Sequence, residues 1–152
     1  EICACLVGSE MCIRDRNSDW RSKEEVLKGM TDNLLLAGRC RYPRKLEADL
    51  WAREAVFSTG LGFSFAIPHS KSEHIEQSTI SVARLAQPVV WGDEEAQFVI
   101  MLTLNKHSAG DQHMRIFSRL ARRIMHAEFR QSLVSAESSE DIADLLRREL
   151  EL

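Results

Sequence analysis

The stretch "STGLGFSFAIPHSKSEH", residues 58–74, changes character twice within a short span. Its two early glycines allow backbone conformations that are closed to other residues, so they mark a turn. The apolar side chains at positions 63, 65 and 67 then alternate with smaller ones, which predicts a β-strand. Polar residues follow directly after Pro68-His69. We therefore expect the strand to end there and to bring His69 to the surface.

The proline in front of His69 restricts the backbone. Pro68 fixes its own φ and biases Ile67 toward an extended conformation, so the strand is held straight up to its end. A reactive group must be aimed before it is useful, and a rigid strand end suits an imidazole nucleophile. The alternative is that His69 only terminates the strand and bonds to nearby backbone. The residues alone leave both interpretations open.

Two helices are predicted before this stretch. Ser22 and Glu25 have the spacing of a capping box, and apolar residues at helical spacing follow up to Leu35. Gly38 supplies a stop. Pro43 can open a second helix, which carries Arg53 near its end.

Strands and helices follow in that order after residue 74. Residues 79–85 alternate, and "QFVIMLTL" (residues 97–104) is nearly continuous, as in a central strand covered on both faces. Turn residues in "QPVVWGDEEA", residues 87–96, predict a connection between them. Helical periodicity begins near Gln112 and returns near residues 127 and 138. This order predicts an α/β domain, with a mixed β-sheet flanked by helices on both faces.

Composition excludes several classes of protein. A net charge of -3 over 152 residues gives no reason to expect nucleic acid or an anionic membrane as a partner. No apolar run approaches the roughly 20 residues that a membrane-spanning helix needs. Cys40 is the one cysteine after residue 16, which fits a reducing cytoplasm and excludes a disulfide framework in residues 17–152.

The first sixteen residues form a separate case. "LVGSEMCIRDR", residues 6–16, resembles the translation of a sequencing adapter. We therefore predict that residues 1–16 are not native and that residues 17–152 form the domain. The three cysteines of this segment have the pattern C-x-C-x6-C, without a fourth ligand at a spacing typical of zinc sites.

Two further side chains could act with His69. His113 lies where a helix begins, and free N–H groups at a helix N-terminus favour an anion such as phosphate. Arg53 could bind a phosphoryl group through two parallel hydrogen bonds. The alternatives are a partly buried residue beside the helix cap for His113 and an exposed helix charge for Arg53. A metal or hydrolase site built from His69 and His113 lacks both an H-E-x-x-H spacing and a nucleophile-elbow motif.

Residues 53–75, "REAVFSTGLGFSFAIPHSKSEHI", resemble the active-site segment of type 2 (fructose–mannitol) EIIA domains of the bacterial sugar phosphotransferase system. Those domains show Arg-Glu, then Ser-Thr-Gly, then Gly-x-x-x-Ala-(Ile/Val)-Pro-His. These motifs fall here on Arg53-Glu54, residues 58–60 and residues 62–69. "DQHMRIFSRLARRI", residues 111–124, resembles the His-led helix of the family, and residues 138–150 resemble its closing helix. The resemblance covers residues 20–150.

The resemblance implies a phosphoryl relay with a phosphohistidine intermediate. HPr, or a fused HPr-like domain, would phosphorylate His69. His69 would pass the group to an EIIB domain, and a membrane EIIC subunit would import the sugar. His113, Arg53 and the Thr59 hydroxyl are the expected stabilisers of the phosphoryl group, without a metal or cofactor. A neutral imidazole is a good nucleophile near pH 7, which suits this chemistry.

The family also sets expectations for the ends of the domain and for its use. Family members usually begin with a strand before the first helix, and residues 1–16 occupy that place, so we expect that the sheet lacks its first strand. "LLRRELEL", residues 145–152, has the character of a native terminus, as in an EIIA at the end of a multidomain protein. An alternative function is a regulatory EIIA-like module whose phosphorylation controls a transcription factor or transporter. The sugar is not encoded, since EIIA domains do not contact it.

Overall fold

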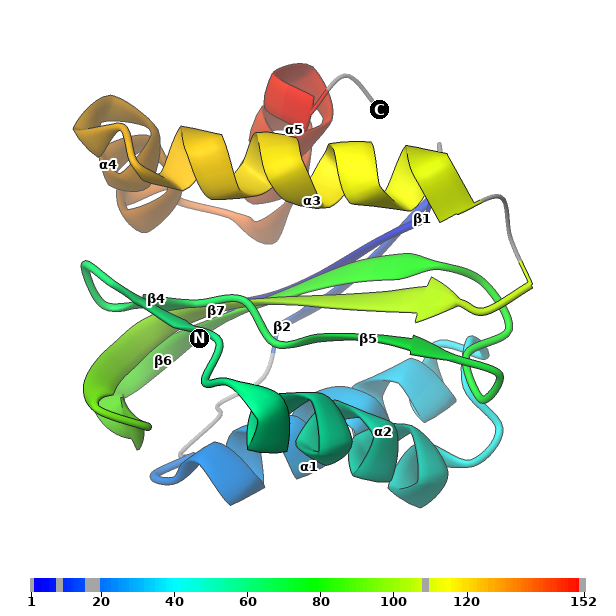
Figure 1. Cartoon of the computed structure of the whole chain (residues 1–152). Coiled ribbons are helices and arrows are strands. Elements are labelled where there is room, and N and C mark those ends of the chain that lie inside the picture. The colour runs from blue at the N-terminus through cyan, green and yellow to red at the C-terminus, as the bar shows by residue number, and fades with distance from the viewer. Residues whose placement is uncertain (1, 8–9, 16–19, 108–109, 151–152) are drawn as a thin grey trace.

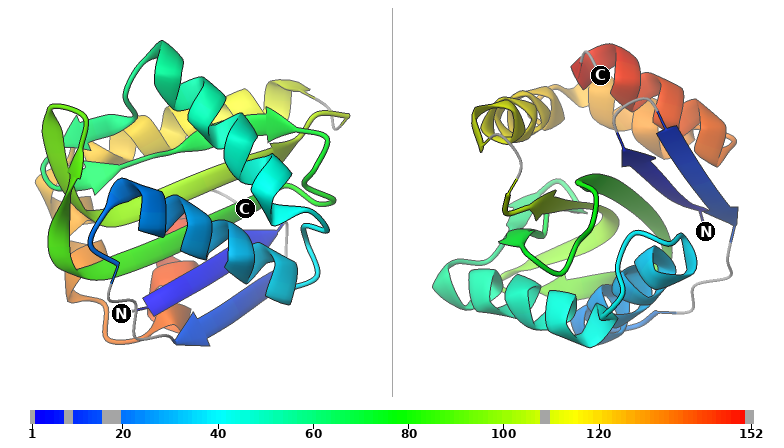
Figure 2. Two further views of the ribbon diagram at one scale, coloured as in Figure 1. Left: turned by 90° about the horizontal axis from the view of Figure 1, so that it is seen from below. Right: turned by 90° about the vertical axis from the view of Figure 1, so that its right-hand side faces the viewer.

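One mixed β-sheet lies between two layers of helices (Figure 1). The computed structural model describes the backbone of residues 2–7, 10–15, 20–107 and 110–150, and the side chains of residues 20–107 and 115–150. Helices α1 (Lys23–Leu36) and α2 (Pro43–Val56) cover one face of the sheet. Helices α3 (Gly110–Ile124), α4 (Ala127–Ser135) and α5 (Ser139–Leu150) cover the other (Figure 2). The predicted α/β class, with helices on both faces of a mixed sheet, is confirmed.

The two longest described strands form the centre of the sheet. Strands β6 (Thr79–Trp91) and β7 (Glu94–Asn105) pair antiparallel and are joined by Gly92 and Asp93 alone. The connection predicted over residues 87–96 is therefore present but confined to Gly92 and Asp93, and the other eight residues belong to the two strands. Gly92 has a φ of +64° at the first turn position, where a type II′ hairpin takes glycine. Turn residues in a sequence mark where a chain reverses, but they do not show how tight the reversal is.

Three short strands extend the sheet beyond β7. They are β3 (Gly60–Gly62), β4 (Phe65–Ala66) and β5 (His69–Ser72). Both β4 and β5 run parallel to β7, and β3 pairs antiparallel with β4. The predicted strand over residues 63–67 is only partly right, because Phe63 and Ser64 have positive φ values of 57° and 67° and form the turn between β3 and β4. The Phe63 side chain is consequently exposed rather than buried.

The opposite edge of the sheet is formed by the segment that the sequence analysis set aside. Strands β1 (Ile2–Val7) and β2 (Glu10–Asp15) pair antiparallel with each other, and β1 pairs antiparallel with β6. We expected that the sheet would lack its first strand; the structure instead has two strands at this edge. Backbone groups form such a ladder without any alternation of side chains, so a pattern of side chains does not reveal it. The non-native origin of residues 1–16 stays a prediction.

The helix boundaries follow the expected signals. Ser22 caps α1 by accepting a hydrogen bond from the backbone N–H of Glu25, at 3.2 Å. The Glu25 carboxylate in turn accepts from the backbone N–H of Arg21, at 2.8 Å. Gly38, with a φ of +76°, follows the end of α1, and Pro43 opens α2. These signals set where α1 begins and ends and where α2, the helix that carries Arg53, begins.

Strand β7 is buried on both faces, as its sequence predicts. Phe98, Ile100 and Leu102 face the core under α3, α4 and α5, whereas Val99 and Met101 face the core under α1 and α2. All five side chains are at most 2% exposed. The alternation follows from the two-residue period of a strand, which sends neighbouring side chains to opposite faces. One strand thus holds both layers of helices in place around the segment that carries His69.

Candidate functional site

His69 begins a strand instead of ending one. It is the first residue of β5 and pairs with Leu102 of β7, and the carbonyl of Pro68 accepts from the N–H of Leu102 at 2.9 Å. Phe65 pairs with Phe98 at the same offset, so the chain keeps its register with β7 across Ile67 and Pro68. The half-buried imidazole is therefore carried by backbone tied to the central strand of the sheet.

The two ring nitrogens of His69 have different partners. Nδ1 lies 2.9 Å from the carbonyl oxygen of Ile67, and a carbonyl can only accept, so Nδ1 carries the proton. Nε2 accepts a hydrogen bond from Nε of Arg53, at 3.1 Å. The ring is therefore a neutral imidazole whose lone pair is on Nε2, the nitrogen that faces the guanidinium. A neutral imidazole nitrogen with a free lone pair is the form of histidine that can act as a nucleophile.

The surroundings of the ring favour this neutral form. Burial lowers the pKa of His69 below its ordinary value of 6.5. The hydrogen bond to Ile67 opposes this shift, the charge of Arg53 adds to it, and the charge of Glu54 opposes it. Because burial dominates, the imidazole keeps its lone pair at neutral and mildly acidic pH.

Arg53 lies in the last turn of α2 and reaches the sheet edge. Besides its bond to His69, it donates from Nη1 to the carbonyl oxygen of Phe57, at 3.0 Å. These two bonds use two of the five N–H donors of a guanidinium. The sequence-predicted pair Arg53 and His69 is thus brought together, in a geometry that places a positive charge beside Nε2 of His69.

Thr59 forms hydrogen bonds with Glu54 and Trp91. Its hydroxyl donates to the Glu54 carboxylate, its backbone N–H donates to the same carboxylate at 3.2 Å, and its oxygen accepts from the indole N–H of Trp91 at 3.1 Å. The Thr59 side chain is buried. Its single hydroxyl proton is therefore engaged with Glu54, and a direct role as donor to a phosphoryl group stays a prediction.

Lys23 of α1 completes this buried group. Its ammonium lies 2.7 Å from Glu54, whose side chain is 2% exposed. The same ammonium lies 5.4 Å from the ring centroid of Trp51 and 5.1 Å from that of Trp91. A buried carboxylate requires a counter-charge and hydrogen-bond donors, and Glu54 has both here.

The second histidine of the prediction lies only partly within the described structure. His113 falls in the first turns of α3, but its side chain lies outside the described residues. One helical turn later, the ring of Phe117 contacts the His69 ring, with 4.6 Å between centroids. Residues four apart share a helix face, so position 113 is on the face of α3 that carries this contact. A stabilising role for His113 stays a prediction.

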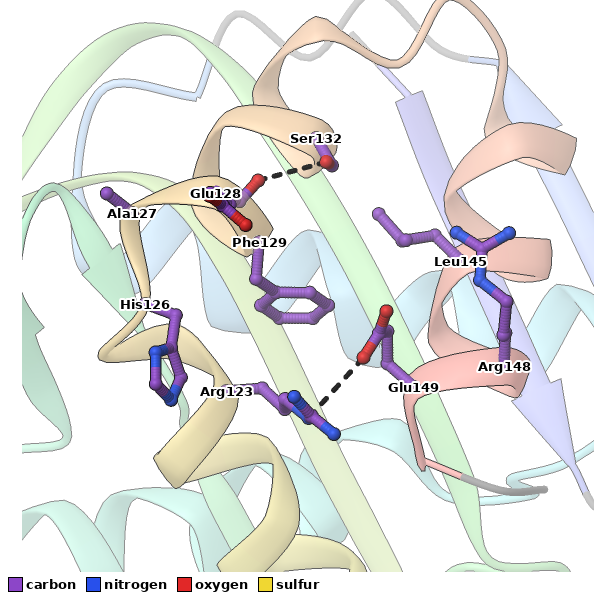
Figure 3. A pocket seen from close by; sticks show the side chains of 9 residues that line it. All are labelled: Arg123, His126, Ala127, Glu128, Phe129, Ser132, Leu145, Arg148 and Glu149. Atoms are coloured by element: carbon purple, nitrogen blue, oxygen red, sulfur yellow. Dashed lines mark hydrogen bonds and ion pairs between the residues drawn. The ribbon is translucent and has the colours of Figure 1, made fainter.

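A hollow of about 560 Å³ lies elsewhere, between α3, α4 and α5 (Figure 3). Its lining includes Phe129, Arg148 and an ion pair between Arg123 and Glu149, with 3.4 Å between Nε and Oε2. Neither His69 nor Arg53 lines it. This hollow is therefore separate from His69 and Arg53.

Residues 9–149 match the profile of the family "Phosphoenolpyruvate-dependent sugar phosphotransferase system, EIIA 2". The chain belongs to this family. It is 87% identical over 149 residues to "Multiphosphoryl transfer protein 2" of Escherichia coli K12, an alignment that covers 98% of this EIIA chain but only 18% of that relative.

Two solved structures share the fold of this EIIA chain. "Nitrogen Regulatory Protein IIA-Ntr from Neisseria meningitidis" superposes with a TM-score of 0.74 at 25% identity, covering 84% of this chain and 88% of that one. The IIA subunit in the "Complex of enzyme IIAMTL and phosphorylated enzyme IIBMTL from Escherichia coli" gives 0.69 at 19% identity, covering 87% and 92%.

Membership of the family gives this EIIA chain a role in phosphoryl transfer within the phosphotransferase system. Within the described ranges, no helix has the length and apolar character to cross a membrane. The same ranges hold no group of three His, Cys, Asp or Glu side chains arranged to bind a metal ion.

Sequence reasoning missed the buried residues around the site. Glu54 was identified only as half of an Arg-Glu pair, and Lys23 and Trp91 were not singled out. One signal for Lys23 was available: a cation in the first turn of a helix is unfavourable, because the helix N-terminus carries partial positive charge. Trp91 carried no such signal, since a tryptophan at the end of a strand is usually core.

Proposed function

We propose that this chain is a phosphocarrier that accepts a phosphoryl group on Nε2 of His69 and passes it on. The observation that carries the proposal is the neutral His69 imidazole, whose Nε2 lone pair faces the Arg53 guanidinium at 3.1 Å. The donor is HPr or an HPr-like domain, and the acceptor is an EIIB domain that serves a membrane EIIC subunit in sugar uptake. The chain acts in the cytoplasm.

The transfer step follows from this geometry. The Nε2 lone pair attacks phosphorus, the bond between phosphorus and its donor breaks, and a phosphorus–nitrogen bond forms at Nε2. The Nδ1 proton stays on the ring, where its hydrogen bond to Ile67 stabilises the positive charge that the imidazole gains. Arg53 releases Nε2 and donates to the phosphoryl oxygens, where the charge of a loose transition state is concentrated. His113 and Thr59 are the further proposed donors.

Exposed apolar side chains next to Arg53 support a protein as the partner. Val56 and Phe57, at the end of α2, are 79% and 75% exposed. Apolar groups exposed beside a reactive residue are typical of a docking surface for another protein. The relative named as a multiphosphoryl transfer protein, and the solved complex of a IIA subunit with phosphorylated IIB, support HPr-like and EIIB partners.

The test is reconstitution with enzyme I, HPr and labelled phosphoenolpyruvate. We expect the wild-type chain to gain one acid-labile phosphoryl group and His69→Ala to gain none. His74→Ala is the matched control, since His74 is a partly exposed histidine in the turn directly after β5. Label that persists in His69→Ala would refute the assignment, and label lost in His74→Ala would refute its specificity.

A regulatory module is the second candidate function. It is favoured by the similarity to a structure named as a nitrogen regulatory protein, at 25% identity and a TM-score of 0.74. Adding an EIIB domain to the phosphorylated chain separates the two functions. Rapid loss of label from the chain to EIIB supports the relay, whereas retention of the label supports regulation.

A further inference from the structure

Lys23, the first residue of α1, is placed where a cation is locally unfavourable. The partial positive charge of a helix N-terminus repels a cation and favours carboxylates, such as those of Glu24 and Glu25 in the same turn. The Lys23 ammonium nevertheless bonds to Glu54, which lies 31 residues later in the chain. Such a long-range bond between partly buried charges indicates a role beyond the stability of α1.

Glu54 connects this ammonium to the segment that leaves α2. Its carboxylate binds Lys23 at 2.7 Å and accepts two hydrogen bonds from Thr59, one from the backbone and one from the hydroxyl. The Glu54–Thr59 bonds close residues 54–59 into a short loop. The carbonyl of Phe57, which holds Nη1 of Arg53 at 3.0 Å, lies inside this loop.

Trp91 fixes the same loop from the sheet. Its indole N–H donates to Thr59 at 3.1 Å, and its ring lies 5.1 Å from the Lys23 ammonium. The ammonium therefore lies among a carboxylate and two indole rings, which is a favourable site for a cation that has lost part of its water.

We propose that Lys23 is a positioning residue for phosphoryl transfer. Its ammonium holds the Glu54 carboxylate in place, Glu54 holds Thr59, and the closed loop presents the Phe57 carbonyl that aims Arg53 at Nε2 of His69. Lys23 does not touch the reacting atoms and acts only through this chain of contacts. The inference rests on the proposed function, because Arg53 is aimed at the phosphoryl-accepting nitrogen.

The experiment compares Lys23→Met with Lys23→Arg and with the control Lys28→Met, which changes an exposed lysine of the same helix. Phosphorylation of the chain by phospho-HPr is measured as a function of HPr concentration. We expect Lys23→Met to lower the maximal rate by about tenfold while the HPr concentration at half-maximal rate is unchanged. Lys23→Arg should recover most of the rate, and Lys28→Met should equal wild type.

A double-mutant cycle separates positioning from a general loss of structure. If Lys23 acts through Arg53, then Lys23→Met lowers the rate much less in an Arg53→Gln background than in wild type. An equal loss in both backgrounds would overturn the inference, as would an unchanged maximal rate in Lys23→Met. If Lys23→Met does not fold, the double variant Lys23→Met/Glu54→Gln replaces it, because this variant removes both charges of the ion pair. Its rate is then compared in the wild-type and Arg53→Gln backgrounds.

Failure of the proposed function has a different signature. In that case the wild-type chain itself gains no label, whatever residue is at position 23. A nitrogen-15 spectrum of the His69 ring gives a further readout that needs no partner protein: Lys23→Met should remove the effect of the Arg53 hydrogen bond on the Nε2 signal. A Nε2 signal identical to that of wild type would contradict the inference.

Discussion

The hydrogen-bond partners of the two His69 ring nitrogens determine which nitrogen carries the proton. The Ile67 carbonyl holds the proton on Nδ1, so the lone pair is left on Nε2, beside Arg53. Both partners come from the motif itself, two residues before His69 and sixteen residues before it. The motif therefore contains the groups that select the tautomer of the proposed phosphoryl acceptor.

The lowered pKa of His69 makes a prediction for the pH dependence of phosphoryl acceptance. Since burial favours the neutral ring, the rate should decline on acidification with a midpoint below pH 6.5. The midpoint of the decline should equal the His69 pKa measured by NMR. A decline centred at or above 6.5 would contradict this prediction.

The same shift has a consequence for stability. A histidine whose pKa is lower in the folded state than in the unfolded state stabilises the fold above the unfolded value. That contribution is lost as the pH falls through the folded pKa. The His69→Gln variant, which does not titrate, should therefore lose less stability than wild type between pH 7 and 5.

At the scale of elements, the site depends on the contact between the β6–β7 turn and the loop after α2. A Cβ atom built on Gly92 would lie 2.6 Å from Oγ and 3.0 Å from Cβ of Ser58, a neighbour of Thr59. The turn between the two central strands is thus packed directly against the loop that holds Arg53. Only glycine meets both demands at this position, a positive φ and the absence of a side chain.

We predict that Gly92→Ala destabilises the protein by about 2–3 kcal/mol, through strain at positive φ and the clash with Ser58. Gly38→Ala is the matched control, because Gly38 has a φ of +76° but no atom within 4 Å of its added Cβ. It should cost only the strain, roughly 1 kcal/mol. Urea unfolding measures both, and equal losses would show that the Ser58 contact contributes nothing.

Patterns within single elements were readable from the sequence, whereas contacts between elements were not. The helix caps, the Pro43 start and the doubly buried strand at residues 97–104 depend on local periodicity, and the structure has them. The tight turn at Gly92 and the positive φ of Phe63 depend on what packs against them. The Arg53–His69 pair was foreseen through the motif, but the buried charge of Lys23 joins segments that are distant in sequence.

In the whole molecule, the sheet separates two hydrophobic cores, and β7 contributes side chains to both. The three tryptophans, Trp20, Trp51 and Trp91, all belong to the core under α1 and α2. Leu133 of α4 is fully buried in the other core. Because one strand belongs to both cores, loss of packing on one face should weaken the other.

Leu133→Ala tests this coupling. We expect it to cost about 2–5 kcal/mol, as for a buried leucine that leaves a cavity. Tryptophan fluorescence reports the distant core and far-UV circular dichroism reports the helices of both faces, so both urea curves should shift by the same amount. A fluorescence transition that stays at the wild-type midpoint would show that the two layers unfold independently.

Pro68, which precedes His69, also affects how a partner protein can bind at this edge of the sheet. Pro68 has no N–H to offer, and β5 is only four residues long, so this margin of the sheet is a poor template for an added strand. We therefore expect a partner protein to bind here without adding a strand to the sheet. A surface without strand pairing leaves each partner free to depart whole, as the proposed carrier requires when one partner protein replaces another.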